Sequence, residues 1–146
     1  MAQSGALTQS EVQDLVYTWF RKITDKCPED EMLAMLSTDG LEMRFPERTL
    51  KSYDDFRDWY HGVAGLFFDQ VHELKMLAVD LDGERANVTL VVNWQAHTWN
   101  PPAAYSEWSS FLIHQDWTVR RDRASGRPVI VTYLVGTADP MRTRPV

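Results

Sequence analysis

The chain of 146 residues has the length of one domain, and its apolar fraction of 44% is ordinary for a globular protein. The net charge is −6 and the acidic excess lies within residues 1–70, which argues against nucleic-acid binding because phosphate contacts need a basic stripe. One cysteine, no apolar signal segment and no apolar run of membrane-spanning length predict a cytoplasmic protein without an internal disulfide or a membrane partner.

Residues 1–7 are expected to form a flexible leader before the first helix. Thr8 and Glu11 have the spacing of a capping box, in which each side chain bonds the other residue's backbone N–H. The next residues place one apolar stripe at helical spacing: Val12, Leu15, Val16, Trp19, Phe20 and Ile23. The pattern predicts an amphipathic helix that buries this stripe.

Two further helices are expected before the sheet. Pro28 suits the start of the second helix and Gly40 its end, and a short strand follows over residues 41–45. Ser52 is the expected N-cap of the third helix, whose apolar stripe is Phe56, Trp59, Tyr60, Val63 and Phe67. Two amphipathic helices need a common apolar surface, and the later strands are the candidates to supply it.

From residue 71 the alternation predicts an antiparallel meander of strands over 71–81, 86–99, 105–121 and 129–136, followed by a loose C-terminal tail over 137–146. The first two are joined by an Asp-Gly turn at 82–83. In the first strand the apolar residues occupy even-numbered positions up to Met76 and odd-numbered positions from Leu77 onwards, which predicts a β-bulge between them. With one bulge, His72 lies on the same side as Trp94 and across from it.

The two faces of the strands 86–99 and 105–121 decide which side chains enter a cavity. We expect the Trp94 side to carry Trp108, Ser110, Leu112, His114 and Asp116. The outer side is expected to carry Phe111, Ile113, Gln115, Trp117 and Val119, with Val91 and His97 from the neighbouring strand. A slip of one residue would exchange the two sets. An outer face this apolar would indicate an interface, so we expect a homodimer through the sheet.

The turn over residues 122–128 joins the last two strands, and a basic cluster surrounds it. Because it surrounds a turn, we expect the cluster to be a solvated hairpin tip. Its members are Arg120, Arg121, Arg123 and Arg127.

The order of helix, helix, short strand, helix and long meander predicts an α+β fold with helices on one face of the sheet. On this order the sequence resembles the NTF2-like superfamily, in its SnoaL-like branch, over residues 8–136. The motifs that carry the resemblance lie at 12–20, 36–40, 52–56, 72–88, 115–117 and 127–130. The resemblance implies a cystatin-like cone, a curved sheet around an apolar cavity that is often dimeric through its convex face. Members include polyketide cyclases, ketosteroid isomerase, limonene epoxide hydrolase and scytalone dehydratase, which need no metal.

The spacing is most similar to that of scytalone dehydratase. The resemblance aligns His72 and His97 with two pocket histidines of that enzyme and His114 with a pocket asparagine. It also puts Ile23 and Thr24 where the enzyme has a helix tyrosine and aspartate, and Phe45 where it has a strand tyrosine. The catalytic set of the dehydratase is therefore incomplete here. The alternation of the strand puts His97 outside, which conflicts with this alignment unless a second bulge intervenes.

The candidate catalytic group is led by His72 as a general base, with Asp116 or His114 as its partner. For each of these residues the alternative is a hydrogen-bonded structural role. His61 lies past its apolar stripe and is expected to be solvated. The expected cavity walls are Trp94, Trp108, Trp59, Tyr17, Phe20 and Phe45. The histidines show no metal-ligand spacing, so we expect no metal and no cofactor.

Two classes of function stay open at this point. The first is a cofactor-free lyase, isomerase or cyclase acting on a small apolar, oxygenated or aromatic molecule, with His72 as base. The second is a non-catalytic ligand-binding or dimeric assembly domain, including a scaffold like the β subunit of ring-hydroxylating dioxygenases. The incomplete catalytic sets favour the second class.

Overall fold

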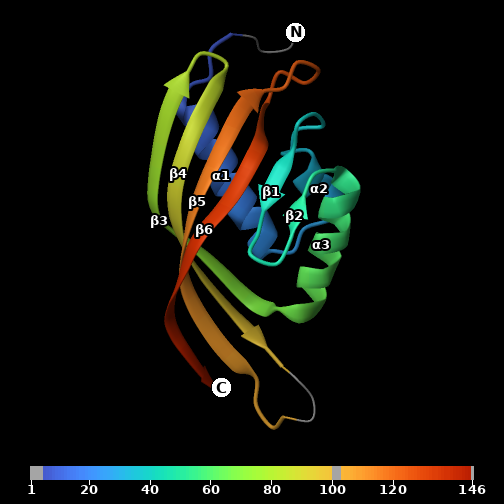
Figure 1. Cartoon of the computed structure of the whole chain (residues 1–146), viewed down its shortest axis with the longest axis vertical. Helices are drawn as coiled ribbons and strands as arrows, with labels where there is room; N and C mark the ends of the chain where they lie inside the picture. The colour runs from blue at the N-terminus through green and yellow to red at the C-terminus, as the bar shows by residue number, and fades with distance from the viewer. Residues whose placement is uncertain (1–4, 100–102, 146) are drawn as a thin grey trace.

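The computed structural model describes residues 5–99 and 103–145, without the side chains of 63, 64 and 141–145. It confirms the expected α+β class, with three helices on a six-stranded mixed sheet (Figure 1). The helices are α1 (Gln9–Thr24), α2 (Glu29–Leu33) and α3 (Tyr53–Leu66). The strands are β1 (Glu42–Arg44), β2 (Thr49–Leu50), β3 (Phe68–Asp82), β4 (Arg85–Thr98), β5 (Glu107–Arg121) and β6 (Pro128–Pro145). Their order in the sheet is β2-β1-β6-β5-β4-β3.

Helix α1 forms as its sequence predicts. Both bonds of the Thr8–Glu11 capping box are present, and the whole expected stripe is buried. Trp19, fully buried at the centre of this stripe, packs with ring centroids 6.0 Å from Phe56 of α3 and 6.2 Å from Trp117 of β5. One indole thus joins both long helices to the sheet, which is why α1 lies against the strands in Figure 1.

Helix α2 is shorter than expected, because it ends at Leu33 rather than near Gly40. The chain that follows pairs with β6 instead of continuing the helix. Ile130 N donates to Met35 O and Ser37 N donates to Ile130 O, both at 2.8 Å. Two bonds to a neighbouring strand replace the helical bonds that the next turn of α2 would have made. Ser52 caps α3 as predicted, and Asp55 N donates to its hydroxyl at 3.1 Å.

The β3–β4 hairpin matches its prediction closely. Gly83 has a positive φ of 63° in the turn, the conformation that glycine adopts without steric cost. The pairing of β3 with β4 shifts register between Leu74 and Met76, which confirms the predicted bulge. His72 consequently pairs with Trp94 and lies on the same face of the sheet.

The predicted faces of β5 are exchanged in the structure. Trp94 pairs with Phe111 and Val88 pairs with Trp117, so the inner side carries Phe111, Ile113, Gln115, Trp117 and Val119. Asp116 and His114 therefore lie on the outer side, against the expectation. The physical reason is burial: Trp117 and Val119 are 2% and 0% exposed, and placing them in water would forfeit several kcal/mol, about 1.5–3 for each large side chain.

This exchange removes the observation that led to the expected homodimer. The outer face was expected to be apolar through Phe111, Ile113, Trp117 and Val119, and all four lie on the inner side. At the positions opposite Val91 and Thr89, the outer face instead carries His114 and Asp116, both exposed. A dimer through this face now depends on the family resemblance alone.

The expected leader and tail are more ordered than predicted. Residues 1–4 and the loop at 100–102 lie outside the described residues, but Leu7 is buried and its N–H donates to Gly83 O at 2.8 Å. Strand β6 continues to Pro145, which pairs with Glu107 of β5, where a loose tail was expected. Strand β5 has backbone groups along its whole length that can pair with β6, and the C-terminal residues of β6 continue this pairing as far as Glu107.

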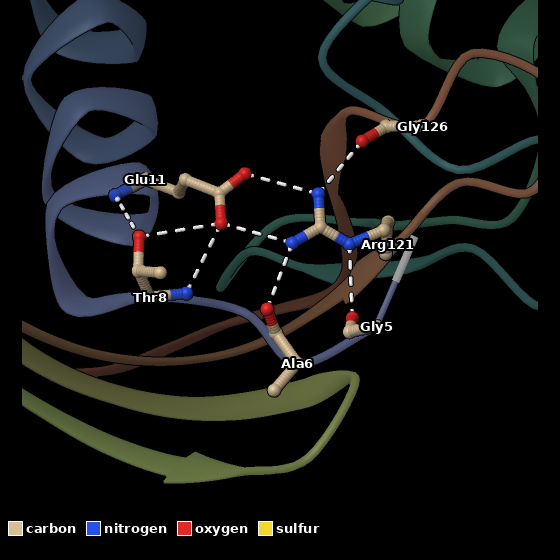
Figure 2. Close-up of polar contacts among 6 residues, drawn as sticks. All are labelled: Gly5, Ala6, Thr8, Glu11, Arg121 and Gly126. Atoms are coloured by element: carbon tan, nitrogen blue, oxygen red, sulfur yellow. Dashed lines mark hydrogen bonds and ion pairs between the residues drawn. The ribbon is translucent and has the colours of Figure 1, made fainter. Parts of the chain in front are cut away.

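Arg121 does not belong to a solvated hairpin tip as expected, because it is 7% exposed. Figure 2 shows its guanidinium held by the Glu11 carboxylate, with two contacts of 2.9 and 3.0 Å. The same group donates to the carbonyl oxygens of Gly5, Ala6 and Gly126. It thereby ties the start of the described chain to α1 and to the β5–β6 turn. This hydrogen bond from the guanidinium is the main cause that lowers the pKa of Glu11.

Candidate functional site

A cavity of about 630 Å³ lies between the inner face of the sheet, α1 and α3. Side chains from α1, α3, the β1–β2 connection and all four long strands line it. Most of its wall is apolar, and a third of the lining residues are aromatic. The aromatic lining residues include Phe20, Phe45, Trp59, Phe67, Trp94 and Phe111.

A continuous row of rings links β6 to β4, and every member except the buried Trp117 lines the cavity. Tyr133 stacks on Trp117 with centroids 4.9 Å apart, and Trp117 lies 5.7 Å from Phe20. Phe20 lies 5.7 Å from His72, which lies 6.5 Å from Trp94. Neighbouring rings in the row are within about 35° of parallel. The four members that line the cavity, Tyr133, Phe20, His72 and Trp94, offer ring surfaces against which a flat ligand can pack.

His72 is the imidazole of this row, brought to the cavity by the bulge in β3. Its Nδ1 lies 2.9 Å from Thr24 Oγ1 at the end of α1, so a hydroxyl rather than a carboxylate orients the ring. Burial lowers the pKa of His72 from 6.5 to about 4. The imidazole is therefore uncharged at neutral pH. Because Thr24 engages Nδ1, the other nitrogen, Nε2, is the one left for a ligand.

The expected partners of His72 lie outside the cavity. Asp116 is exposed on the outer face, where its carboxylate accepts a hydrogen bond from Thr89 Oγ1 at 3.1 Å. The side chain of His114 is 49% exposed, and its Nε2 lies 3.5 Å from an Asp139 carboxylate oxygen. The structure thus brings neither residue to His72. Both predictions followed from the one-residue error in the register of β5.

Four of the six expected wall residues line the cavity: Trp94, Trp59, Phe20 and Phe45. The other two, Trp108 and Tyr17, do not belong to its lining. Tyr17 is 57% exposed, since it lies on the solvent side of α1.

His97 occupies the outer side, as the alternation of β4 predicts. It pairs with Trp108 and stacks on Phe68 of β3 with centroids 5.5 Å apart. The second histidine of the dehydratase alignment therefore has no counterpart in this cavity among the described lining residues. His61 is exposed as expected, with Nε2 2.7 Å from Glu29.

Three uncharged polar lining residues were missed by the sequence analysis. Gln70 Oε1 accepts from Trp94 Nε1 at 3.0 Å, and Gln115 Oε1 accepts from Trp117 Nε1 at 2.9 Å. Tyr133 is buried, and burial raises its pKa to about 12. The alternation of apolar residues in β5 contained the signal for Gln115, because the most apolar face of a strand is normally the buried one.

The mouth of the cavity carries its charged groups. Arg48 Nη1 donates to Asp58 at 2.6 Å, and Trp59 Nε1 donates to Glu47 at 3.3 Å. Trp59 also stacks on Phe45 with centroids 4.3 Å apart. The entrance thus holds one ion pair and one carboxylate bonded by an indole, and the polar groups deeper in the cavity are neutral.

Within the part of the chain that the structure describes, no group of three or more His, Cys, Asp or Glu side chains is placed to hold a metal ion. No helix within the same residues is long and apolar enough to cross a membrane.

The fold and the cavity define a small α+β pocket domain with one neutral imidazole in an aromatic wall. The sequence profile of the SnoaL-like domain family matches residues 5–134. The chain therefore belongs to the SnoaL-like family, as the sequence motifs predicted. A comparison with curated proteins finds no match.

Solved structures with the same fold come from the NTF2-like family and share little sequence. A candidate scytalone dehydratase of Novosphingobium aromaticivorans has a TM-score of 0.75 at 13% identity, covering 94% of this chain and 86% of its own. A hexachlorocyclohexane dehydrochlorinase of Novosphingobium barchaimii has a TM-score of 0.75 at 13% identity, covering 94% and 89%. A candidate dehydratase from the NTF2-like family of Streptomyces avermitilis has 0.71 at 13%, covering 91% and 95%. Identities this low establish the fold alone.

Proposed function

We propose that the cavity binds a small, uncharged, ring-containing molecule that is apolar over most of its surface. The observation that carries this proposal is the cavity of about 630 Å³ walled by a row of stacked rings with one neutral imidazole among them. Its volume lies within the range of about 300–1,000 Å³ that is usual for small-molecule sites.

The charge of the ligand follows from the groups that would surround it. Inside the mouth the polar side chains are His72, Gln70, Gln115 and Tyr133, and burial keeps His72 unprotonated at neutral pH. A buried ligand charge would find no opposite charge among these four groups and would lose its hydration. Uncharged ligands avoid that loss.

A second candidate function is catalytic: a cofactor-free lyase or isomerase that uses His72 as general base. It is favoured by the unprotonated state of the imidazole and by the named activities of two structural neighbours, a dehydratase and a dehydrochlorinase. The chemistry has a cost, however. An imidazolium formed at His72 would be stabilised by the Thr24 hydroxyl rather than by a carboxylate, and a base with a pKa of about 4 takes protons with little driving force. Binding is therefore the first proposal and catalysis the second.

Calorimetric titration with naphthalene-sized and cyclohexane-sized neutral compounds tests the binding proposal. We expect dissociation constants in the micromolar range for several of them. The substitution Trp94→Ala should weaken binding about tenfold or more, since one stacked indole supplies a large part of the contact area. The matched control is Trp108→Ala on the outer side, which should leave affinity unchanged. If none of these compounds binds, or if both variants bind equally weakly, the cavity is not the site.

A homodimer and a cytoplasmic location also remain proposals. The first is supported by the family resemblance and the second by the single cysteine, Cys27. Light scattering after size exclusion tests the dimer, and a mass of 16.9 kDa at micromolar concentration would refute it.

A further inference from the structure

Tyr133 and Gln115 form a polar pair in the cavity wall, separated from His72 by the rings of Trp117 and Phe20. Both side chains line the cavity and are almost fully buried, with exposed fractions of 4% and 5%. They come from neighbouring strands, because Tyr133 of β6 pairs with Trp117 of β5, two residues after Gln115. The pair is therefore part of the rigid sheet, at the opposite end of the aromatic row from His72.

The amide of Gln115 is oriented before any ligand arrives. Trp117 Nε1 donates to Gln115 Oε1 at 2.9 Å, so the oxygen of the amide is already occupied. Trp117 itself is 2% exposed and stacks on both Tyr133 and Phe20, which holds its indole in place. A hydrogen bond from the Gln115 side chain is among the causes that lower the pKa of Tyr133, so one amide N–H is directed at the phenol oxygen and the second can serve another acceptor.

The phenol of Tyr133 is a hydrogen-bond donor at all physiological pH values. Burial raises its pKa to about 12, while the Trp19 and Gln115 side chains act in the opposite direction. The proton therefore stays on the oxygen. Two uncharged donors, a phenol O–H and an amide N–H, thus lie together in the cavity wall.

We propose that Tyr133 and Gln115 form a subsite for an uncharged oxygen acceptor of the ligand, such as a ketone or ester carbonyl. The inference rests on the proposed function and narrows it: the ligand is a flat ring system with a carbonyl-type oxygen at the end remote from His72. A carboxylate fits less well. Arg48, the one arginine or lysine among the described lining residues, is paired with Asp58 at the mouth.

The expected selectivity comes from the cost of leaving buried donors unpaired. A site built to bond an oxygen rejects an analogue that lacks it, because both donors would then lose water without gaining a partner. A hydrocarbon of the same shape should still enter through its apolar contacts. The difference between two such ligands isolates the subsite from the rest of the cavity.

The test compares 2-acetylnaphthalene with 2-ethylnaphthalene, which differ in the carbonyl oxygen, by calorimetric titration of the whole protein. We expect the wild type to bind the ketone about tenfold or more tightly than the hydrocarbon. Tyr133→Phe should remove most of that preference and leave the hydrocarbon affinity unchanged. Gln115→Glu, which keeps the acceptor for Trp117 but loses the N–H donor, should also reduce it. The matched control is Tyr60→Phe, a buried tyrosine outside the cavity lining whose hydroxyl donates to Cys27 O.

The outcomes separate this inference from the proposal on which it rests. Equal wild-type affinities for the two compounds overturn the subsite and leave the apolar pocket standing. A preference that survives Tyr133→Phe overturns the subsite as well. Failure of both compounds to bind overturns the pocket and the subsite together. The comparison of the two ligands on the wild type needs no variant, so it decides the question even if a substitution unfolds the protein.

Discussion

Replacing His72 by glutamine should make the stability of the protein less sensitive to acid. Burial lowers the pKa of His72 from 6.5 to about 4 in the folded state. Between these two pH values His72 is protonated in the unfolded chain and unprotonated in the folded protein. The stability that the neutral, buried imidazole allows is thus fully present above about pH 6.5 and is lost as the pH falls towards 4. A pKa difference of this size corresponds to a loss of up to about 3 kcal/mol in the free energy of unfolding. Glutamine can still bond Thr24 but does not titrate.

Urea unfolding at several pH values between 7 and 4 measures this effect. The free energy of unfolding of the wild type should fall more steeply than that of His72→Gln, and the two curves should converge by up to about 3 kcal/mol. Acidic groups such as Glu11 contribute equally to both proteins and cancel in the difference. Phe45→Leu damages the same wall at a ring that has no contact with His72 in the row, so its difference from the wild type should stay constant with pH. Parallel curves for the wild type and His72→Gln would refute the burial argument.

Three further predictions follow from the site, the buried ion pair and the register. If a substrate is found, kcat/KM should rise with pH through about 4 and stay level at higher pH, and a rise near pH 6.5 would contradict the lowered pKa of His72. His72→Gln should lower kcat/KM about 100-fold or more. Glu11→Gln leaves the buried guanidinium of Arg121 (Figure 2) without its carboxylate and should lower the free energy of unfolding in urea by about 3 kcal/mol. Glu31→Gln, in the exposed pair with Lys22, should lower it by under about 1 kcal/mol, and equal losses would show that burial of the Arg121 pair does not matter. Trp117→Ala should destabilise by about 3–5 kcal/mol and Asp116→Ala by about 0.5 or less, and the reverse order would mean that the observed register of β5 is wrong.

Local patterns were sufficient for helix α1, for the start of α3 and for the first hairpin, but not for the end of α2. The stripe and the capping box of α1 involve contacts three or four residues apart, and both formed where the sequence predicted them. The bulge in β3 could also be predicted from the sequence. The apolar residues of this strand switch from even-numbered to odd-numbered positions, and one inserted residue keeps them all on the same face. These features, with their order, were enough to predict the α+β class and to place His72 opposite Trp94.

The second half of the site depended on pairing between distant residues. A shift of one residue in β5 moves every side chain to the other face, so the same strand can offer Asp116 and His114 or Gln115 and Trp117 to the cavity. Both registers have the same period of two, but the face that carries Trp117 is more apolar than the face that carries Asp116, and this difference already favoured the observed register.

By itself, the sequence determined helix α1, the start of α3, the first hairpin and the way in which His72 reaches the inner face. Only the tertiary structure decided that Gln115 and Tyr133 share the cavity with it, that Arg121 is buried, and that β6 extends to Pro145. The physical reason is the range of the interactions. Helical stripes and turns are set by neighbours along the chain, whereas strand register, a buried ion pair and the volume of a cavity are set by contacts between residues far apart in it.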